Sequence, residues 1–257
     1  MMITLLSDWK LRDPYIGIFK GQLLNLIPNA QIVDITHSLE MFNLSQTAFI
    51  AKNSYPFFPK KSLHIILSEL SFDLETKPVL LHHDEHFFLG EDTGVFSMMF
   101  GMENIKEIVE FNGDMSLSET EKLAAMASWV FQGNYKKHTI PYTALKFQIS
   151  NLSESDYNAE RKLISGKIAY IDSCCNAVTN IPVAMFEAVN KKSFKATVSN
   201  NARPLKITRF HPYYNPKESE VFLVNNRLGF IEIALYKGNI AALADIKVGN
   251  DIEIEFS

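Results

Sequence analysis

The chain has 257 residues, of which 47% are hydrophobic, and its 25 lysines and arginines stand against 29 acidic residues, a net charge of −4. This length allows one large domain or two modest ones. The absence of a clustered basic stretch argues against a nucleic-acid partner. No segment reaches the roughly 18 apolar residues that span a bilayer, and the N-terminus lacks the basic segment of a signal peptide. Because the only cysteines are the adjacent Cys174 and Cys175, we expect a cytoplasmic protein without membrane contact.

The first half of the chain alternates predicted strands and helices. Helical spacing of apolar residues predicts a helix over 14–26, and Ser118 followed by acidic residues predicts the start of another. The expected helices are 14–26, 44–54 and 119–132, and the expected strands are 3–6, 31–35, 63–68, 79–83 and 86–90. Strands interleaved with helices indicate an α/β domain with a mostly parallel sheet.

Beyond about residue 150 the chain changes to short β-branched segments separated by turns. A polar stretch, "NLSESDYNAERK", precedes them and resembles a linker. We therefore predict an α/β domain over 1–150, a linker over 151–165, and a small all-β, barrel-like domain over 166–257. The expected strands lie within 166–173, 193–199, 205–210, 220–226, 229–236 and 251–256.

Asp8 follows the first predicted strand of the α/β domain, in "LLSDWKLRDP". Ligands of such sheets bind outside the carboxyl ends of the strands, and a carboxylate there suits the hydroxyls of a ribose. The alternative is that Asp8 caps a turn.

The stretch "LLHHDEHFFL" places His82, Asp84 and His86 at alternate positions, which would share one face of a strand. The same letters form two apolar strands joined by a polar turn at 83–85, so we expect a hairpin tip. Side chains at a tip diverge and lack supporting partners, and we expect no metal site.

The segment "YIDSCCNAVTNI" is the most polar stretch within a β pattern. A carboxylate and an amide, Asp172 and Asn176, can together recognise an ammonium group and the edge of a base. A cysteine nucleophile has no evident neighbouring base, so Cys174 and Cys175 fit better as small hydrophobic residues. No Gly-rich phosphate loop or dinucleotide motif is present.

Five stretches, in order, resemble one family. They are "ITLLSDWKLRDPYIGIFKG" (T-D-F-G-x-x-D-x-Y-V-G-x-M-K-G), "NAQIVDITHSL" (D-I-T-H), "SYPFFPKKSLHIIL" (Y-x-x-F-P-x-G-T-x-H-V-x-V), "YIDSCCNAVTNI" (I-D-x-F-G-N-L-I-T-N-I) and "GFIEIALYKGNIAA" (L-E-I-A-x-x-x-G-N-A-A). The chain is identified as a member of the S-adenosyl-L-methionine (SAM) hydroxide adenosyltransferase family, whose relatives are the SAM-dependent fluorinase and chlorinase.

The resemblance implies an α/β domain followed by a β-barrel, and a homotrimer that holds SAM between neighbouring subunits. The implied reaction is attack of water-derived hydroxide on the ribose C5′, which releases adenosine and L-methionine. SAM is then a small-molecule substrate or ligand, and no cofactor or metal is implied. The protein orients and desolvates the nucleophile.

By the same resemblance, Asp8 matches the aspartate that holds the ribose hydroxyls, and Asp172 the aspartate that holds the methionine ammonium. Asn176 matches the asparagine that reads adenine. Phe42 lies where the halogenating relatives place an aromatic wall, and Ile240 where the backbone meets the adenine edge.

The loop after the third strand departs from the family. The hydrolases carry V-D-P-G-V-G-x-x-R there, whereas this chain has "SELSFDLET". Glu69 takes the place of the catalytic aspartate, Thr76 that of the arginine, and the place of the family histidine falls near Ser118. The glycines, which favour close backbone approach to a ligand, are replaced, and Leu70 and Phe72 are bulky.

The predicted C-terminal domain also departs from the family. Cys174 and Cys175 replace a phenylalanine and a glycine, and "NNRLG" places Arg227 at a serine of the carboxylate-binding motif. Arginine can pair with a carboxylate through two hydrogen bonds.

Three readings follow from these departures. The first is a SAM hydrolase with an altered site in which Glu69 is the remaining carboxylate that can orient water. The second is a non-catalytic SAM- or adenosine-binding protein, a pseudoenzyme that acts as a sensor or sink. The third is a structural relic whose pocket is filled by Leu70 and Phe72. Halogenation is disfavoured because the loop lacks small residues.

Overall fold

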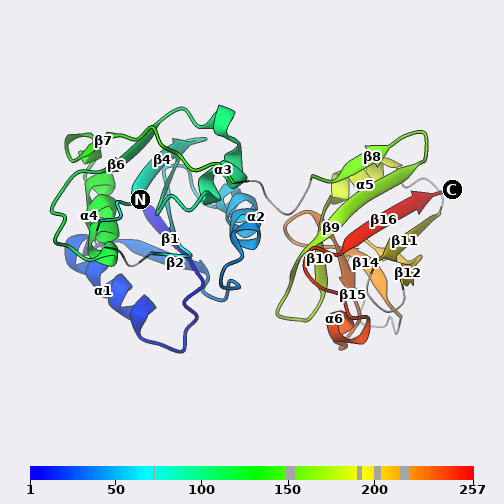
Figure 1. Ribbon diagram of the computed structural model, residues 1–257. Coiled ribbons are helices and arrows are strands. Elements are labelled where there is room, and N and C mark those ends of the chain that lie inside the picture. The colour runs from blue at the N-terminus through cyan, green and yellow to red at the C-terminus, as the bar shows by residue number, and fades with distance from the viewer. Residues whose placement is uncertain (72, 74, 149–153, 190–192, 200–203, 215–219) are drawn as a thin grey trace. The chain divides into compact units, whose positions relative to one another are not determined.

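The computed structural model describes residues 1–71, 73, 75–148, 154–189, 193–199, 204–214 and 220–257. The chain divides into two compact units, Met1–Ile149 and Ser150–Ser257, and each is described by itself. Figure 1 shows helices around a sheet in the first unit and a curled sheet in the second. No helix within the described ranges is long and apolar enough to cross a membrane.

The first unit is built on a seven-stranded sheet in the order β2-β1-β3-β5-β4-β6-β7. Strand β1 pairs in parallel with β2 and β3, and β3 pairs in parallel with β5, so the carboxyl ends of these strands meet at one edge. The pairs β5–β4, β4–β6 and β6–β7 are antiparallel. The strands are β1 (Met2–Ser7), β2 (Gln31–Thr36), β3 (Leu63–Leu67), β4 (Val79–His83), β5 (His86–Gly90), β6 (Ile108–Phe111) and β7 (Thr139–Pro141).

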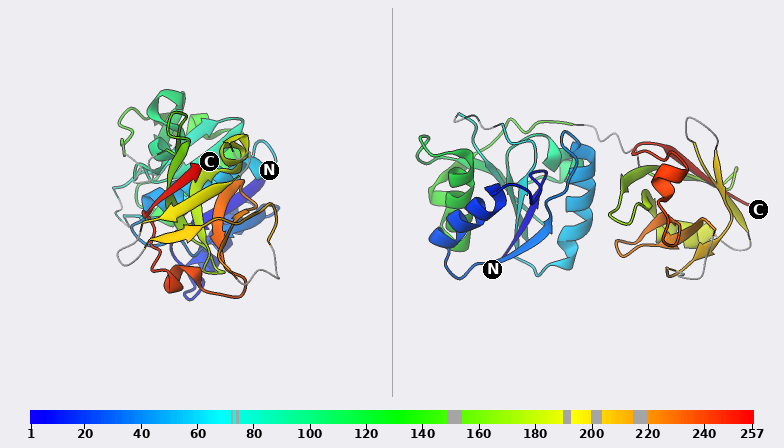
Figure 2. Two further views of the ribbon diagram at one scale, coloured as in Figure 1. Left: turned by 90° about the vertical axis from the view of Figure 1, so that its right-hand side faces the viewer. Right: turned by 90° about the horizontal axis from the view of Figure 1, so that it is seen from below.

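Helices cover both faces of this sheet, as Figure 2 shows. Helices α1 (Tyr15–Leu26) and α4 (Glu119–Phe131) pack against each other on one face, and α2 (Leu44–Ser54) and α3 (Val95–Phe100) on the other. Short 3₁₀ turns lie at η1 (Tyr55–Phe57), η2 (Met102–Asn104) and η3 (Tyr135–Lys137). The predicted α/β fold of this domain is confirmed, with the antiparallel strands β6 and β7 as an addition.

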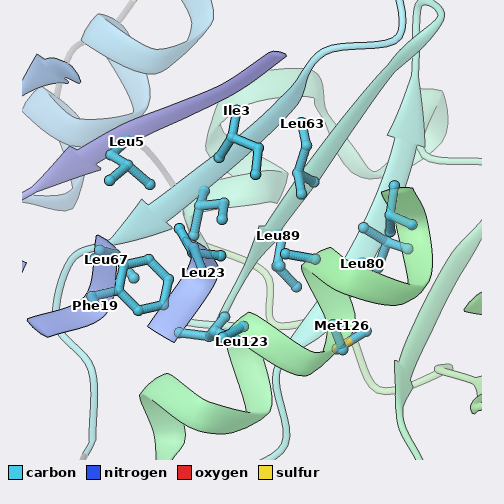
Figure 3. Packing of buried hydrophobic residues seen from close by; sticks show 14 of the residues in the cluster. Ile3, Leu5, Phe19, Leu23, Leu63, Leu67, Leu80, Leu89, Leu123 and Met126 are labelled. Atoms are coloured by element: carbon cyan, nitrogen blue, oxygen red, sulfur yellow. The ribbon is translucent and has the colours of Figure 1, made fainter. Parts of the chain in front are cut away.

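The two faces follow from the alternation of side chains along each strand. In β3, Leu63, Ile65 and Leu67 belong to the core under α1 and α4, whereas Ile66 belongs to the core under α2 and α3. Figure 3 shows the first of these cores, with Phe19 of α1 and Leu123 of α4 among the strand residues. A strand buried on both faces reads as a continuous apolar run, which is how "LHIIL" could be predicted.

The start of α4 is fixed locally. The Ser118 side chain accepts from the backbone of the first turn, and the Glu121 side chain accepts from the Ser118 amide at 2.9 Å, which completes a capping box. The predicted Ser118 cap is therefore confirmed, and it satisfies amide groups that would otherwise lack partners.

The predicted hairpin at 83–85 is confirmed, with Asp84 and Glu85 as its two turn residues at φ of 46° and 62°. The hairpin also separates His82, Asp84 and His86, as expected for side chains at a tip. The two-residue turn pairs His83 with His86, so His86 is buried while His82 and Asp84 are exposed.

A buried polar chain crosses β1, β3 and β5. The Thr4 hydroxyl lies 2.7 Å from His64 Nδ1, and His64 Nε2 lies 3.0 Å from His86 Nδ1. The His64 ring also stacks on Phe88, with centroids 5.0 Å apart. Burial, and to a smaller extent the neighbouring His86, lowers the pKa of His64 to about 3.

The second unit is a nine-stranded sheet in the order β12-β11-β16-β9-β10-β15-β14-β13, with β8 paired to β9. Its inward residues form one core, to which β16 contributes Ile252, Ile254 and Phe256 and the short helix α5 contributes Phe186. The predicted all-β C-terminal domain is confirmed as this curled sheet. The elements are β8 (Asp156–Asn158), β9 (Leu163–Ile171), β10 (Ala177–Pro182), α5 (Val183–Val189), β11 (Phe194–Val198), β12 (Leu205–Ile207), β13 (Phe210–His211), β14 (Phe222–Asn225), β15 (Phe230–Ala234), α6 (Ile240–Leu243) and β16 (Asp251–Phe256).

Strand β8 and the start of β9 lie within 151–165, the range predicted as a linker. Strand β10 lies within the polar stretch after Asn176 and pairs with both β9 and β15. Its side chains Thr179 and Asn180 are buried, and the Thr179 hydroxyl donates to the Ile231 carbonyl at 2.7 Å. A polar residue with an internal partner can occupy a central strand.

We expect His64 to make the fold sensitive to acid. The unfolded chain binds a proton on this histidine near pH 6.5, whereas the folded chain does so only near pH 3. Stability is therefore fully present above 6.5 and falls as the pH drops through this window. Thermal unfolding of wild type and of a Thr4→Val/His64→Phe double variant, which leaves no unpaired hydroxyl at residue 4, should show a smaller pH dependence in the variant.

The exposed His82 provides the control, since His82→Gln should leave the pH dependence of the melting temperature unchanged. Equal losses of melting temperature between pH 7 and pH 4.5 in wild type and the double variant would contradict this role of His64.

Candidate functional site

A pocket of about 940 Å³, here named the main pocket, lies at the carboxyl ends of the parallel strands of the first unit. Its lining comes from the loop after β1, from α1, from residues 41–42 and 69–70, and from the first turn of α4. Asp8, Phe42 and Glu69, three of the residues predicted from the sequence, all line it. This is the edge at which α/β sheets bind ligands.

Asp8 is half-buried and holds the loop that follows β3. Its Oδ2 accepts a hydrogen bond from the Glu69 amide at 3.1 Å and another from the Ser68 hydroxyl at 3.4 Å. Both readings of Asp8 are therefore compatible with its position, since it caps a loop and also lines the main pocket.

Glu69 has a left-handed backbone, with φ of 55°. Only glycine adopts this conformation without cost, and another residue there carries strain of about 1 kcal/mol or more. The glycine-poor loop thus keeps a glycine-like backbone at this residue. Burial raises the pKa of the Glu69 carboxyl, and the nearby charge of Asp8 raises it further.

Leu70 and Phe42 differ in how they face the main pocket. Leu70 is 8% exposed and packs in the core under α1 and α4, so a pocket of about 940 Å³ remains beside it. Phe42 is 82% exposed at φ of 60° and presents its ring at the pocket lining. The predicted obstruction by Phe72 lies outside the described residues.

In the sequence, Glu119 at the start of α4 is only one of the acidic residues of a helix first turn. In the structure it is 8% exposed, lines the main pocket, and its Oε1 has no hydrogen-bond partner. The available signal was its position, one residue after Ser118, where the resemblance places the family histidine.

A second pocket of about 530 Å³, here named the acidic pocket, shares Glu69 with the main pocket. It includes Glu91, the residue after β5, which is 7% exposed. Glu91 Oε2 accepts from the Ser71 amide at 3.0 Å, whereas its Oε1 has no partner. Burial raises the pKa of Glu91. The hydrogen bonds from Ser71 lower this pKa and the charge of Glu119 raises it, and the net effect is a raised pKa.

The neighbouring Asp92 is buried and well satisfied. Its Oδ2 accepts from the Tyr142 hydroxyl at 2.9 Å and the Lys146 amide at 2.7 Å, and its Oδ1 accepts from the Gly94 amide at 3.3 Å. Asp92 therefore fastens the segment around Tyr142 to the sheet and has partners on both oxygens, whereas Glu91 has one oxygen without a partner.

In the second unit, Asp172 organises a tight turn between β9 and β10. Its Oδ1 accepts from the Cys174 amide at 2.9 Å and the Asn176 amide at 2.8 Å. Cys175 sits in this turn at φ of 63°, in the left-handed region. A glycine, which the resemblance places at residue 175, would suit this backbone better.

Asn176 is buried, and its side chain is oriented by Glu232, which the sequence motifs do not single out. Its Nδ2 donates to Glu232 Oε1 at 2.9 Å, and its Oδ1 has no partner. Burial, together with the charge of Asp172, raises the pKa of Glu232 to about 7. Glu232 stands in the quoted "GFIEIALY" stretch, in a strand interior where a carboxylate is unusual, and that was the available signal.

Ile240 lies next to the Asp172 turn, whereas Arg227 lies in the turn between β14 and β15. Ile240 is buried at the start of α6, and the next amide, of Ala241, donates to the Cys175 carbonyl at 3.3 Å. Arg227 is exposed in the turn between β14 and β15. The preceding Asn226 hydrogen-bonds Glu232, which places Arg227 one residue from a partner of the Asn176–Glu232 pair.

Two tyrosines, Tyr170 and Tyr214, lie near Asp172 and Glu232. Burial raises the pKa of Tyr170 to about 12, with Glu232 and Asp172 adding to the effect. Tyr214 is exposed, and its pKa is raised by partial burial and then by Cys174 and the same two carboxylates. Cys174 is exposed and Cys175 half-buried, and both are free thiols. Tyrosine rings and carboxylates together suit a cationic or heteroaromatic ligand.

Fold and site define a two-part protein, with a pocket at the strand ends of an α/β domain and an Asp–Asn turn in a β domain. Residues 3–134 match the SAM hydroxide adenosyltransferase N-terminal domain, and residues 166–253 match the SAM hydroxide adenosyltransferase C-terminal domain. The chain belongs to the SAM hydroxide adenosyltransferase family, which confirms the assignment from the five motifs.

Curated relatives agree with this assignment. The chain is 24% identical over 261 residues to the (R)-S-adenosyl-L-methionine hydrolase of Methanocaldococcus jannaschii, covering 98% of this chain and 95% of the relative. A Thermus thermophilus protein of the same name is 24% identical over 96 residues, 37% of each chain. Family and relatives support an activity on SAM.

Two solved structures share the fold. A conserved protein of Thermotoga maritima superposes with a TM-score of 0.82 at 20% identity, covering 100% of both chains. A conserved protein of Thermus thermophilus gives a TM-score of 0.69 at 17% identity, with 98% of each chain covered.

We expect Glu232→Gln to stabilise the protein increasingly as the pH rises. The folded-state pKa of Glu232 is raised from 4.5 to about 7. Its contribution to stability is therefore present below 4.5 and lost as the pH rises through 7. Urea unfolding should show that the variant gains on the order of 2 kcal/mol over wild type between pH 5 and pH 8.

Glutamine keeps the acceptor for Asn176, so the substitution changes charge without removing the hydrogen bond. The exposed Glu253→Gln is the matched control in the same unit. A difference between Glu232→Gln and wild type that is constant from pH 5 to pH 8 would contradict the assignment.

Proposed function

We propose that the protein hydrolyses SAM to adenosine and L-methionine. The observation that carries the proposal is that Asp8 and Glu69 line one pocket at the carboxyl ends of the parallel strands, joined by the hydrogen bond from the Glu69 amide to Asp8. Membership of the family and similarity over nearly the full chain to the Methanocaldococcus jannaschii hydrolase support the same reaction.

In this reaction the oxygen of water forms a bond to the ribose C5′ while the C5′–S bond breaks. The bonding electron pair stays on sulfur, so methionine leaves as a neutral thioether. The proton released from water passes to the Glu69 carboxylate. A carboxyl whose pKa is raised is a stronger base in its ionised form, which suits it to this step.

The remaining assignments follow the resemblance. Asp8 holds the ribose hydroxyls and Phe42 forms an apolar wall of the main pocket. In the β domain, Asp172 holds the methionine ammonium, while its other hydrogen bonds go to the backbone of its own turn. Asn176 presents its unpaired Oδ1 to the adenine amino group, since Glu232 already occupies its Nδ2.

Arg227 and Ile240 complete the proposed ligand site. The exposed Arg227 guanidinium pairs with the methionine carboxylate, a geometry in which two hydrogen bonds form at once. The backbone beside Ile240 meets the edge of adenine. The proposed assembly is a homotrimer in which the N-terminal domain of one subunit and the C-terminal domain of the next share one SAM, in a cytoplasmic protein.

A second candidate is a non-catalytic SAM- or adenosine-binding protein, acting as a sensor or sink. Thr76 supports this alternative. It stands where the family hydrolases carry an arginine, and its hydroxyl accepts from the Ser71 hydroxyl at 2.8 Å. The positive charge that the arginine would supply next to Glu69 is therefore missing from this position.

The substitutions Glu69→Gln and Asp8→Ala separate catalysis from binding. We expect Glu69→Gln to lower kcat for SAM hydrolysis by about 10²–10³-fold, because a positioned base contributes that much, and to leave adenosine binding unchanged. We expect Asp8→Ala to weaken adenosine binding by about tenfold, because it removes charge-assisted hydrogen bonds. Adenosine and methionine formation is measured by chromatography, and binding by calorimetry.

The exposed Glu103→Gln serves as the control and should behave as wild type in both assays. Adenosine binding without turnover of SAM would select the non-catalytic binder. Turnover that is unchanged in Glu69→Gln would remove this residue from the mechanism.

Oligomeric state is a separate prediction of the proposal. Light scattering coupled to gel filtration should give the mass of three chains. Mixing Asp8→Ala with Asp172→Ala protein, each impaired alone, should restore part of the activity if one site uses both domains from different subunits. A monomer with full activity would contradict the shared site.

A further inference from the structure

The proposed hydrolysis has a consequence for protons. A sulfonium cation and water give two neutral products and one proton, so the base that receives the proton must release it before the next turnover. Glu69 lines both the main pocket and the acidic pocket, which places it between the reacting atoms and a second polar space. This inference rests on the proposed function.

Glu91 is a buried carboxyl of the acidic pocket without a full set of partners. It is 7% exposed, and its Oε1 makes no hydrogen bond. An unsatisfied buried polar atom costs free energy, commonly about 1–3 kcal/mol. Such a cost is typical of functional sites, where a group is held ready for a ligand or a proton.

The sheet explains why Glu91 lies close to the Glu69 loop. Strands β3 and β5 are parallel neighbours, with Ile66 paired to Gly90, so the residues that follow both strands emerge side by side. The Ser71 amide donates to Glu91 while the Glu69 amide donates to Asp8. The loop is thus fastened at two points, with the acidic pocket on the Ser71 side.

We propose that Glu91 receives the proton from Glu69 and passes it to solvent through the acidic pocket. The transfer leaves Glu69 as a carboxylate and Glu91 as a carboxylic acid, and solvent water then takes the proton from Glu91. Glu91 does not contact the reacting atoms; it acts through Glu69. A carboxyl in the acidic pocket suits this task because it exchanges protons quickly and needs no movement of the backbone.

Titratable groups lie around the acidic pocket on several elements. They are Glu69, Glu75 and Lys77 after β3, Asp92 beside Glu91, Glu110 on β6, Tyr142 and Lys146 on the following segment, and Glu119 on α4. Lys122 of α4 reaches the same loop, because its Nζ donates to the Thr76 carbonyl at 3.3 Å. Lys77 is paired with Glu110 at 3.2 Å, and Asp92 is saturated by three donors. Glu119 raises the pKa of Glu91 and Lys146 lowers it, with the acidic neighbour the stronger.

The test compares wild type with Glu91→Gln, Glu91→Asp and Glu119→Gln. Glutamine keeps an oxygen for the Ser71 amide but cannot take up a proton. We expect Glu91→Gln to lower kcat for SAM about tenfold, within the range of proton-transfer effects, while adenosine binding by calorimetry stays within about twofold. Glu91→Asp should recover part of kcat. A melting temperature within a few degrees of wild type confirms that the variants fold.

The pH profile separates a proton path from a structural role. Removing the charge of Glu119 lowers the pKa of Glu91, so the acidic limb of kcat should move to lower pH in Glu119→Gln. This inference would be overturned if the acidic limb of the kcat profile stayed at the same pH in Glu119→Gln, or if kcat were unchanged in Glu91→Gln. Neither result would contradict the proposed hydrolysis of SAM. Absence of turnover in wild type would overturn the proposed function and the proton path together.

Discussion

The hydrogen bond from the Glu69 amide to the Asp8 carboxylate joins the end of β1 to the loop after β3, and the main pocket depends on it. It forms because β1 and β3 are parallel neighbours whose carboxyl ends leave the sheet side by side. The bond also fixes the left-handed backbone of Glu69, which a residue other than glycine adopts only when its surroundings hold it there. The bond in this way keeps the Glu69 side chain at the main pocket.

The α/β unit also buries two carboxyl groups that are not fully hydrogen-bonded. Glu91 and Glu119 are both less than a tenth exposed and each has an oxygen without a partner. Replacement by apolar residues would relieve that cost, so these residues weaken the fold where they stand. Native proteins accept such costs at sites where chemistry needs them. The proposed hydrolysis, in which the attacking water releases a proton, gives one reason for acidic groups beside the pocket.

In the β domain, the residues proposed to bind the ligand are held in a different way. Asp172 and Asn176 are held by a local turn and by one buried pair, in which the Asn176 amide donates to the Glu232 carboxyl. That pair leaves one oxygen of Asn176 free, and it carries a carboxyl whose pKa is raised to about 7. The charge beside Asn176 therefore depends on pH through Glu232, whereas in the α/β domain the carboxyl groups with a raised pKa, Glu69 and Glu91, line the pockets themselves.

The sequence by itself determined the fold class, the family and most elements of regular structure. Apolar periodicity fixed strands such as "LHIIL" and the helix capped by Ser118, because these patterns arise from local backbone geometry and from burial on one or both faces. Position after a strand was also enough to single out Asp8. Strand β10 was harder to predict because its buried polar residues are satisfied by partners distant in sequence, such as Thr179 on the Ile231 carbonyl.

Only the tertiary structure decided which acidic residues are buried. Glu91 and Glu119 look in the sequence like ordinary turn and helix-start acids, and Glu232 is an unusual carboxylate in a strand whose partner the sequence does not reveal. Burial comes from segments that pack on them from elsewhere in the chain, such as the Ser71 loop on Glu91 and Asn176 on Glu232. The same holds for the β4–β5 hairpin. His86 is buried because the two-residue turn at 84–85 pairs it with His83 and so sets the face of the sheet on which it lies. The sequence specifies which side chains are present, whereas packing between segments distant in sequence decides which of them are buried away from solvent.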